Sequence, residues 1–383
     1  MSLSYTDLSR RFQFALQGYS QTQFFYGQVG GYFYDPAFAP FLSRDDAIGT
    51  RTARGGNAFG IYPFSRYRRV EVSAGLMQLN EEYNDPALQA YSDAYQTAQY
   101  GQSVFRNGTL MPLGAAFIQE TTVFREFGPL SGNTMRLGYS AAPKIGSLLS
   151  KQTLDGDARH YLRLGATGLL ATRIRGFKSI GEYPDFQYFG GNGELRGYDY
   201  LQFAGQNVVF ANAELRFPII EAALTPIGVV GGVRGVFFAG IGGAWFNGQS
   251  TSNPCTGGSN TYQVFTNKSA FCQVPTGVKT DANGGFVTTV DPITGVQTPV
   301  LTYKGQPVSG FRLQDGRASY GLGLETFILG FPLHFDWSWR TLMNSGWEDV
   351  VFGCVTIDSA GKCVNGAAEF RKPRFAVWIG YDF

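Results

Sequence analysis

The residue types that could do chemistry lie mainly at alternate positions of one segment near the C-terminus. His334, Asp336, Ser338 and Arg340 supply a base, a carboxylate, a hydroxyl and a guanidinium. In isolation this row would indicate acid–base or nucleophilic catalysis. A spacing of two, however, places all four on one face of a strand, and inward polar side chains at every second position are typical of a water-filled barrel lumen. We therefore expect no catalytic residue and a protein that is not an enzyme.

The four cysteines form two local pairs. Cys255 and Cys272 lie in one stretch rich in Asn, Thr and Gly, and Cys354 and Cys363 lie in another. No Cys-x-x-Cys motif and no nearby histidine indicates a zinc site, so we expect neither metal nor cofactor. Two loop disulfides formed in an oxidising envelope are the favoured interpretation. Four free thiols are the alternative.

One charged side chain is framed by glycines and an aromatic residue. The stretch from Phe189 to Tyr198 reads Phe-Gly-Gly-Asn-Gly-Glu-Leu-Arg-Gly-Tyr. Its glycines allow tight turns or a close approach to another surface. Alternating apolar segments flank the stretch, so we interpret residues 176–205 as a loop folded into a barrel lumen, with Arg196 held by an inward-facing acid. An ordinary Gly-rich surface hairpin is the alternative. The residues assigned to this motif are Gly190, Gly191, Gly193, Glu194, Leu195, Arg196, Gly197 and Tyr198.

The composition favours a membrane β-barrel over a soluble domain. The chain has 383 residues, of which 15% are aromatic and only 16% are charged, whereas soluble domains carry about 25% charged residues. No apolar run is long enough for a transmembrane helix, but alternating barrel strands never produce such runs. The net charge of +2 and the lack of a basic cluster do not indicate nucleic acid as a partner.

Alternation and turn residues predict about twelve strands. We expect segments 248–315 and 341–370 to be extracellular loops that hold the cysteines. Counting back from the C-terminus places the long segments 35–54 and 81–107 on the periplasmic side, where turns are usually short, so the count carries an error of about two. The predicted strands are 11–19, 22–34, 56–63, 67–80, 113–127, 132–141, 159–175, 206–218, 233–247, 316–329, 331–340 and 371–383.

The last predicted strand has one fully apolar face and ends the chain on phenylalanine. A soluble edge strand of this kind would invite aggregation, whereas the closing strand of a barrel would present that face to lipid. A buried strand of a β-sandwich is the alternative. We expect this apolar face to serve as a C-terminal assembly signal, and it consists of Phe375, Val377, Ile379, Tyr381 and Phe383.

The motif at 190–198 and the terminal strand resemble the BamA/TamA superfamily of outer-membrane assembly barrels, whose signature is an Arg-Gly-aromatic tip on a loop that enters the lumen. The chain is similar to the C-terminal surface-antigen barrel of proteins that carry a TolB-like propeller ahead of it. The resemblance runs through most of the chain, with weaker matches at 5–8, 69–71, 124–130, 157–159 and 212–218. It implies the bacterial outer membrane, contact with lipid, and envelope proteins or client polypeptides as partners.

Two departures from the family pattern matter. Members often carry Phe-x-Asp-x-Gly, with the Asp paired to the loop arginine, but Gly240 stands at that position here. Because side chains alternate between the two faces of a strand, Glu325 and Glu214 are expected to point into the lumen. We expect Glu325 to be the partner of Arg196, with Glu214 as the second choice. The family barrel has sixteen strands, so we expect residues 1–383 to be the C-terminal part of a longer precursor; the start shows no signal peptide. A natural twelve-stranded variant is the alternative.

Two functions fit this sequence. The resemblance implies a barrel that inserts or translocates proteins through a weak seam between its first and last strands. The alternative is a passive barrel that anchors a periplasmic propeller or another protein complex. A short pairing between the terminal strands would favour the first function, and a full pairing the second.

Overall fold

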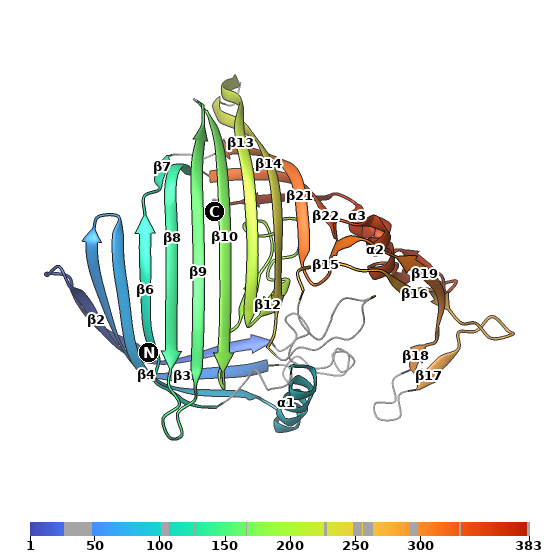
Figure 1. Cartoon of the computed structure of the whole chain (residues 1–383), viewed down its shortest axis with the longest axis horizontal. Coiled ribbons are helices and arrows are strands. Elements are labelled where there is room, and N and C mark those ends of the chain that lie inside the picture. Colours follow the sequence, from blue (N-terminus) through green and yellow to red (C-terminus); the bar gives the residue numbers. More distant parts are fainter. Residues whose placement is uncertain are drawn as a thin grey trace.

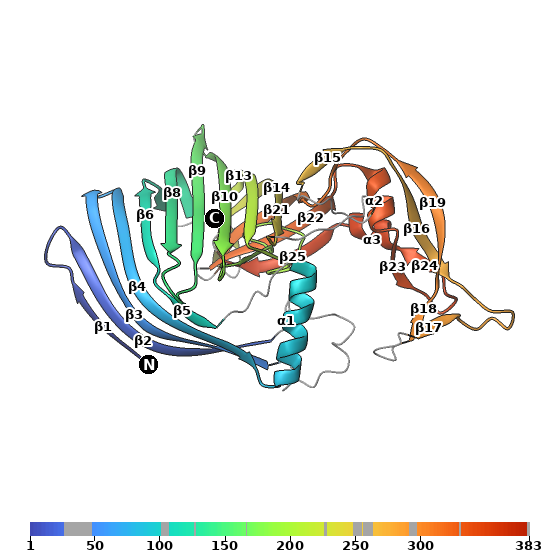
Figure 2. The same cartoon turned by 60° about the horizontal axis from the view of Figure 1, so that its bottom comes forward.

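The protein is dominated by one large, strongly curved antiparallel sheet (Figures 1 and 2). The computed structural model describes residues 1–26, 48–100, 107–125, 128–165, 167–225, 228–247, 255, 263–290, 297–328 and 331–380. The fold is the antiparallel β-barrel predicted from the alternation pattern. Within the described residues its first and last strands, β1 and β25, are the two ends of the strand order and are not paired with each other.

Thirteen strands follow one another along the wall in chain order. They are β1 (Ser2–Asp7), β2 (Gln13–Tyr26), β3 (Ile48–Ser65), β4 (Arg68–Tyr83), β6 (Leu113–Glu120), β8 (Gly128–Ala142), β9 (Lys151–Leu164), β10 (Gly168–Gly181), β13 (Asn207–Thr225), β14 (Gly228–Trp245), β21 (Arg317–Ile328), β22 (Phe331–Thr341) and β25 (Arg374–Ile379). Two short strands, β5 (Gly108–Leu110) and β7 (Val123–Arg125), pair with β4 and β8, and helix α1 (Pro86–Tyr100) follows β4.

Two predicted strand assignments are wrong. The predicted strand 159–175 contains a turn: β9 ends at Leu164 and β10 begins at Gly168, with Gly165 at a φ of 63°. The predicted hairpin 11–34 is instead a single strand from Gln13 to Tyr26 in the described residues, preceded by β1. Apolar alternation runs through both regions, and alternation alone does not distinguish a straight strand from a tight hairpin.

Splitting the segment 159–175 also corrects the predicted sidedness. Because neighbouring strands are antiparallel and the count runs back from the C-terminus, each extra strand moves every connection before it to the other end of the barrel. With β9 and β10 separate, the long connections 27–47, 84–112, 143–150, 182–206, 246–316 and 342–373 all fall at one end, and the tight turns at the other. The connections 27–47 and 84–112, which contain most of the predicted segments 35–54 and 81–107, therefore belong with the long loops, as is usual for the extracellular end of such barrels. Residues 48–54 and 81–83 are instead parts of β3 and β4.

The inner and outer faces of the wall carry different side chains, because successive residues of a strand point to opposite faces. Along β22, buried His334, Asp336 and Ser338 alternate with partly exposed apolar residues. Along β25, Val377 and Ile379 are 53% and 66% exposed on the outer face. None of the described helices is long and apolar enough to cross a membrane.

The two cysteine-containing segments form one structural unit, called the lobe here, at the right of both views (Figures 1 and 2). Strand β16 contacts helix α2 and strands β23 and β24. The lobe has its own apolar core, formed by Cys272, Val274, Val308, Trp347 and Val350. Its elements are β15 (Phe265–Asn267), β16 (Ala270–Val278), β17 (Thr288–Val290), β18 (Gln297–Pro299), β19 (Leu301–Val308), β20 (Phe311–Leu313), α2 (Ser345–Val351), β23 (Cys354–Ile357), β24 (Cys363–Asn365) and α3 (Gly366–Arg371).

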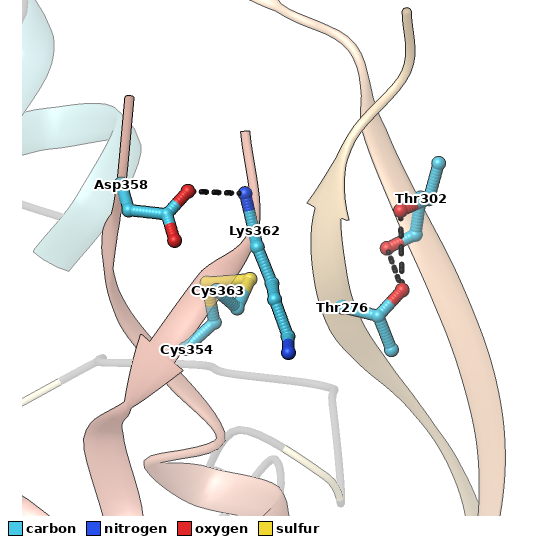
Figure 3. The surroundings of a disulfide bond; sticks show 6 residues. All are labelled: Thr276, Thr302, Cys354, Asp358, Lys362 and Cys363. Atoms are coloured by element: carbon cyan, nitrogen blue, oxygen red, sulfur yellow. Dashed lines mark hydrogen bonds between the residues drawn. A yellow bond between two sulfur atoms is a disulfide. The ribbon is translucent and has the colours of Figure 1, made fainter. Parts of the chain in front are cut away.

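Both expected disulfides are present in the lobe. They join Cys255 to Cys272 and Cys354 to Cys363. Beside the second bond, the backbone N–H of Lys362 donates to an Asp358 carboxylate oxygen at 2.9 Å (Figure 3). The prediction of two local disulfides is therefore confirmed.

Candidate functional site

The segment 182–206 folds against the inner face of the wall. It begins later than the predicted boundary of 176, because β10 continues to Gly181. Within it, β11 (Gln187–Phe189) pairs with β12 (Phe203–Gly205), and β12 contacts β14 (Figure 1). Phe189 is fully buried and stacks on Phe210 of β13, with ring centroids 5.5 Å apart. Leu195 and Tyr198 belong to the same buried cluster, so apolar packing holds the segment inside the barrel.

Three of the four motif glycines have backbone conformations that favour glycine. Gly190, Gly191 and Gly197 have φ values of 127°, 90° and 85°. A Cβ on Gly197 would lie 2.8 Å from the Ser338 hydroxyl oxygen. Gly193 differs from them: it does not have a positive φ, and a Cβ built on it would meet no described atom within 4 Å. The expectation that Gly193 is needed for the loop to fold back is therefore wrong, and Gly197 is the glycine that contacts the wall.

Glu194 closes the turn and joins it to the wall. One carboxylate oxygen accepts from the backbone N–H of Gly190 at 2.9 Å, and the other accepts from Arg175 of β10 at 3.3 Å. Its carbonyl oxygen accepts from the Asn212 side chain of β13 at 2.7 Å. Through this one residue, two wall strands fix the loop backbone directly before the arginine.

Arg196 is 4% exposed and lies among acidic and aromatic side chains. It donates to Glu214 of β13 at 2.5 Å and to Asp336 of β22 at 3.4 Å. Its Nε donates to the Asn192 carbonyl oxygen at 3.1 Å, and its guanidinium carbon lies 4.4 Å from the ring centroid of Phe238. Two carboxylates from separate strands and an aromatic face thus offset the cost of burying this charge.

The bond expected first, between Arg196 and Glu325, is wrong. No hydrogen bond or ion pair joins the two within the part of the chain that the structure describes, and Glu325 lies opposite Arg234 and His334 in the strand register. The second choice, Glu214, is the acid that Arg196 contacts. Parity placed both acids inward but could not distinguish how far along the lumen each one lies.

Asp336 is the partner that sequence reasoning missed. The sequence placed it in the inward row of β22, but only as a possible catalytic residue. Its second carboxylate oxygen accepts from the indole N–H of Trp378 on β25 at 2.7 Å. Gly240, at the position where the family carries its acid, lies against Leu195, and a Cβ there would be 3.0 Å from the leucine side chain. The departure at Gly240 therefore leaves room for the loop, while β22 supplies an acid.

The inward row that resembled a catalytic set makes structural contacts. The Nε2–H of His334 donates to the Gly380 carbonyl oxygen at 2.8 Å, and the imidazole stacks on Trp378 with ring centroids 3.8 Å apart. The Ser338 hydroxyl donates to the Arg374 carbonyl oxygen at 3.2 Å. These side chains connect β22 to β25.

The loop tip also contacts strands β21 and β25 of the wall. The Tyr198 hydroxyl donates to the Ala318 carbonyl oxygen of β21 at 3.2 Å. Burial raises the pKa of this hydroxyl, so it remains a donor at physiological pH. Arg374 of β25 donates to the Gly197 carbonyl oxygen at 3.1 Å and pairs with Asp199 at 2.9 Å. The loop therefore bridges β10, β13, β21, β22 and β25 across the lumen.

The predicted lipid-facing strand is described in part. Phe375, Val377 and Ile379 are each more than half exposed on the outer face. Tyr381 and Phe383 lie outside the described residues. The role of these residues as an assembly signal stays a prediction.

Comparison with known proteins identifies the family. A model of the Omp85 superfamily domain matches residues 46–353. Among solved structures, BamA from Haemophilus ducreyi lacking POTRA domains 1–3 aligns at 12% identity and a TM-score of 0.53, over 99% of this chain and 62% of that one. CdiB from Acinetobacter baumannii aligns at 13% identity and a TM-score of 0.39, over 88% of this chain and 46% of that one.

The similarity to BamA shows a shared fold, and this chain spans less than two thirds of the length of either protein. No curated protein matches the sequence. The family domain covers most of the chain and includes the lumen loop, Glu214 and Asp336. The chain therefore belongs to the Omp85 superfamily.

Proposed function

We propose that this protein is an outer-membrane barrel that inserts or translocates polypeptides, acting through a seam between its first and last strands. The observation that carries the proposal is the buried Arg196 on a lumen loop, bonded to Glu214 and Asp336 on two wall strands. Membership of the Omp85 superfamily supports insertion or translocation at the outer membrane as the general activity, without an enzymatic reaction.

The contacts of the last described strand also support this proposal. Within the described residues, β25 is paired along one edge only, with β22. The loop tip contacts β25 through Arg374 and contacts β13 through Glu214. Under this proposal, the loop holds the last strand in position while the edge of that strand stays available to a client.

The test uses the full chain in proteoliposomes and a urea-denatured eight-stranded outer-membrane barrel as the client. We expect the chain to accelerate client folding, measured by the heat-modifiable shift on gels. Depleting the protein from cells should also lower the amount of particular outer-membrane or secreted polypeptides. Unchanged client folding, together with an unchanged outer-membrane proteome and loss of a bound peripheral protein, would favour the anchoring function instead.

A further inference from the structure

The lobe carries an apolar surface that its own core does not use. Strands β15 and β16 run antiparallel to β20 and β19 and form a two-stranded ribbon. One face of this ribbon covers helix α2, where Cys272, Val274 and Val308 pack on Trp347. In a ribbon with one covered face, the opposite face is normally polar.

The opposite face of this ribbon is aromatic instead. Phe265, Phe271, Tyr303 and Phe311 are 60%, 67%, 57% and 47% exposed, and we call these four residues the aromatic face. The Phe265 and Phe311 ring centroids are 5.8 Å apart. The Phe271 ring lies over Gly305 of the facing strand β19, since a Cβ added to Gly305 would be 2.3 Å from the ring. Four large exposed rings on one face indicate a binding surface.

The aromatic face adjoins the outer surface of the barrel. Leu313 pairs with Phe265 and so shares its side of the ribbon. Leu313 is fully buried against Ala318 and Leu342, with Ile241 beside them. Ala318 has the same parity on β21 as Tyr320 and Leu322, which are 52% and 42% exposed on the outer face. Through buried Leu313, the side of the ribbon that carries the rings is therefore packed against the outer side of β21.

The aromatic face carries no charged side chain. Neither 265–278 nor 301–313 contains an Asp or Glu. Lys304 lies opposite Val274 in the register, so it belongs to the face that covers helix α2 and not to the aromatic face. Uncharged surfaces rich in aromatic rings are typical of segments that lie at the boundary between lipid headgroups and acyl chains.

We infer that the aromatic face binds the outer leaflet of the membrane that surrounds the barrel. The lobe then lies on the membrane surface beside the ends of β14, β21 and β22. This placement fixes the connection between β22 and β25, because helices α2 and α3 of the lobe lie within it.

The first test is photo-crosslinking of the full chain in intact outer membranes. Phe271 or Tyr303 is replaced by p-benzoylphenylalanine, with Phe375 on the outer face of β25 as the positive control. Ile357, 37% exposed on β23 outside the aromatic face, is the matched lobe control. We expect lipid or lipopolysaccharide adducts at 271, 303 and 375 but not at 357. Protein adducts only, or no adducts, at 271 and 303 while 375 gives lipid adducts would overturn the inference.

The second test needs no bulky replacement. Hydrogen exchange of peptides covering 265–278 is compared in detergent, in phosphatidylcholine nanodiscs and in nanodiscs that also contain phosphatidylglycerol. We expect slower exchange in both nanodiscs than in detergent, and a several-fold loss of that protection in the Phe271→Ser, Tyr303→Ser double variant. The matched control is Ile357→Ser, at an exposed position of β23 outside the aromatic face. Equal exchange in detergent and in both nanodiscs would rule out a lipid contact.

Discussion

The guanidinium of Arg374, at the start of the last wall strand, donates to the carbonyl oxygen of Gly197 in the lumen loop at 3.1 Å. The two residues are 177 positions apart in the sequence. Arg374 also pairs with Asp199, and Trp378 on the same strand donates to Asp336, which accepts from Arg196. The loop tip and the inner face of β25 therefore form one connected set of polar contacts.

Arg374→Ala should loosen β25 without unfolding the barrel. The substitution removes both contacts with the loop, one of which is a partly exposed ion pair, so we expect a loss of about 1–2 kcal/mol. Hydrogen exchange of residues 374–379 should become faster. The control is Lys372→Ala, whose side chain is 66% exposed and pairs with Glu369 outside the wall. Equal exchange in the two variants would contradict a role for Arg374 in holding the strand.

Glu214→Gln should release the loop more than Glu325→Gln does. Glu214 accepts from both Arg196 and Arg216, so removing its charge deprives two buried guanidinium groups of a shared partner. Breaking a buried pair typically costs about 3–5 kcal/mol. Glu325 is as buried but makes no such bond to the loop in the described residues. The temperature of heat-modifiable unfolding and proteolysis within 182–206 would measure the effect, and a larger change in Glu325→Gln would refute the assignment.

Gly197→Ala should destabilise the loop, whereas Gly193→Ala should be neutral. At Gly197 the φ of 85° and the contact with Ser338 both disfavour a side chain, and strain of this kind costs about 1–3 kcal/mol. At Gly193 neither condition holds. Limited proteolysis of the two folded variants provides the comparison, and equal sensitivity would show that the tip does not contact the wall as described.

Val377→Arg or Ile379→Arg should prevent stable membrane assembly. Both side chains are more than half exposed on the outer face of β25, and an arginine at the bilayer midplane costs about 2–4 kcal/mol. Val377→Leu, which keeps an apolar surface, is the matched control. Assembly is measured by the heat-modifiable shift in isolated outer membranes. Normal migration of both arginine variants would count against a lipid-facing β25.

The sequence alone determined the fold class, the inner and outer faces of most strands and the two disulfides. These features are local: alternation with a period of two sets the faces, and each disulfide joins cysteines only 17 or 9 residues apart. For Arg196 the local pattern of glycines and aromatic neighbours favoured a close approach to a wall but left a surface hairpin open, and the structure places the side chain in the buried position.

Only the tertiary structure decided which acid meets Arg196, how the two cysteine-containing segments pack, and where the segment 159–175 turns. Glu214, Asp336 and Glu325 all face inward, so their types and parity are equivalent; strand register and the depth of the loop bring the first two to the arginine. Likewise, β16 meets α2 only after β21 and β22 return the chain to the same end of the barrel. Contacts between residues far apart in sequence depend on the summed geometry of all the strands between them, which no local pattern contains.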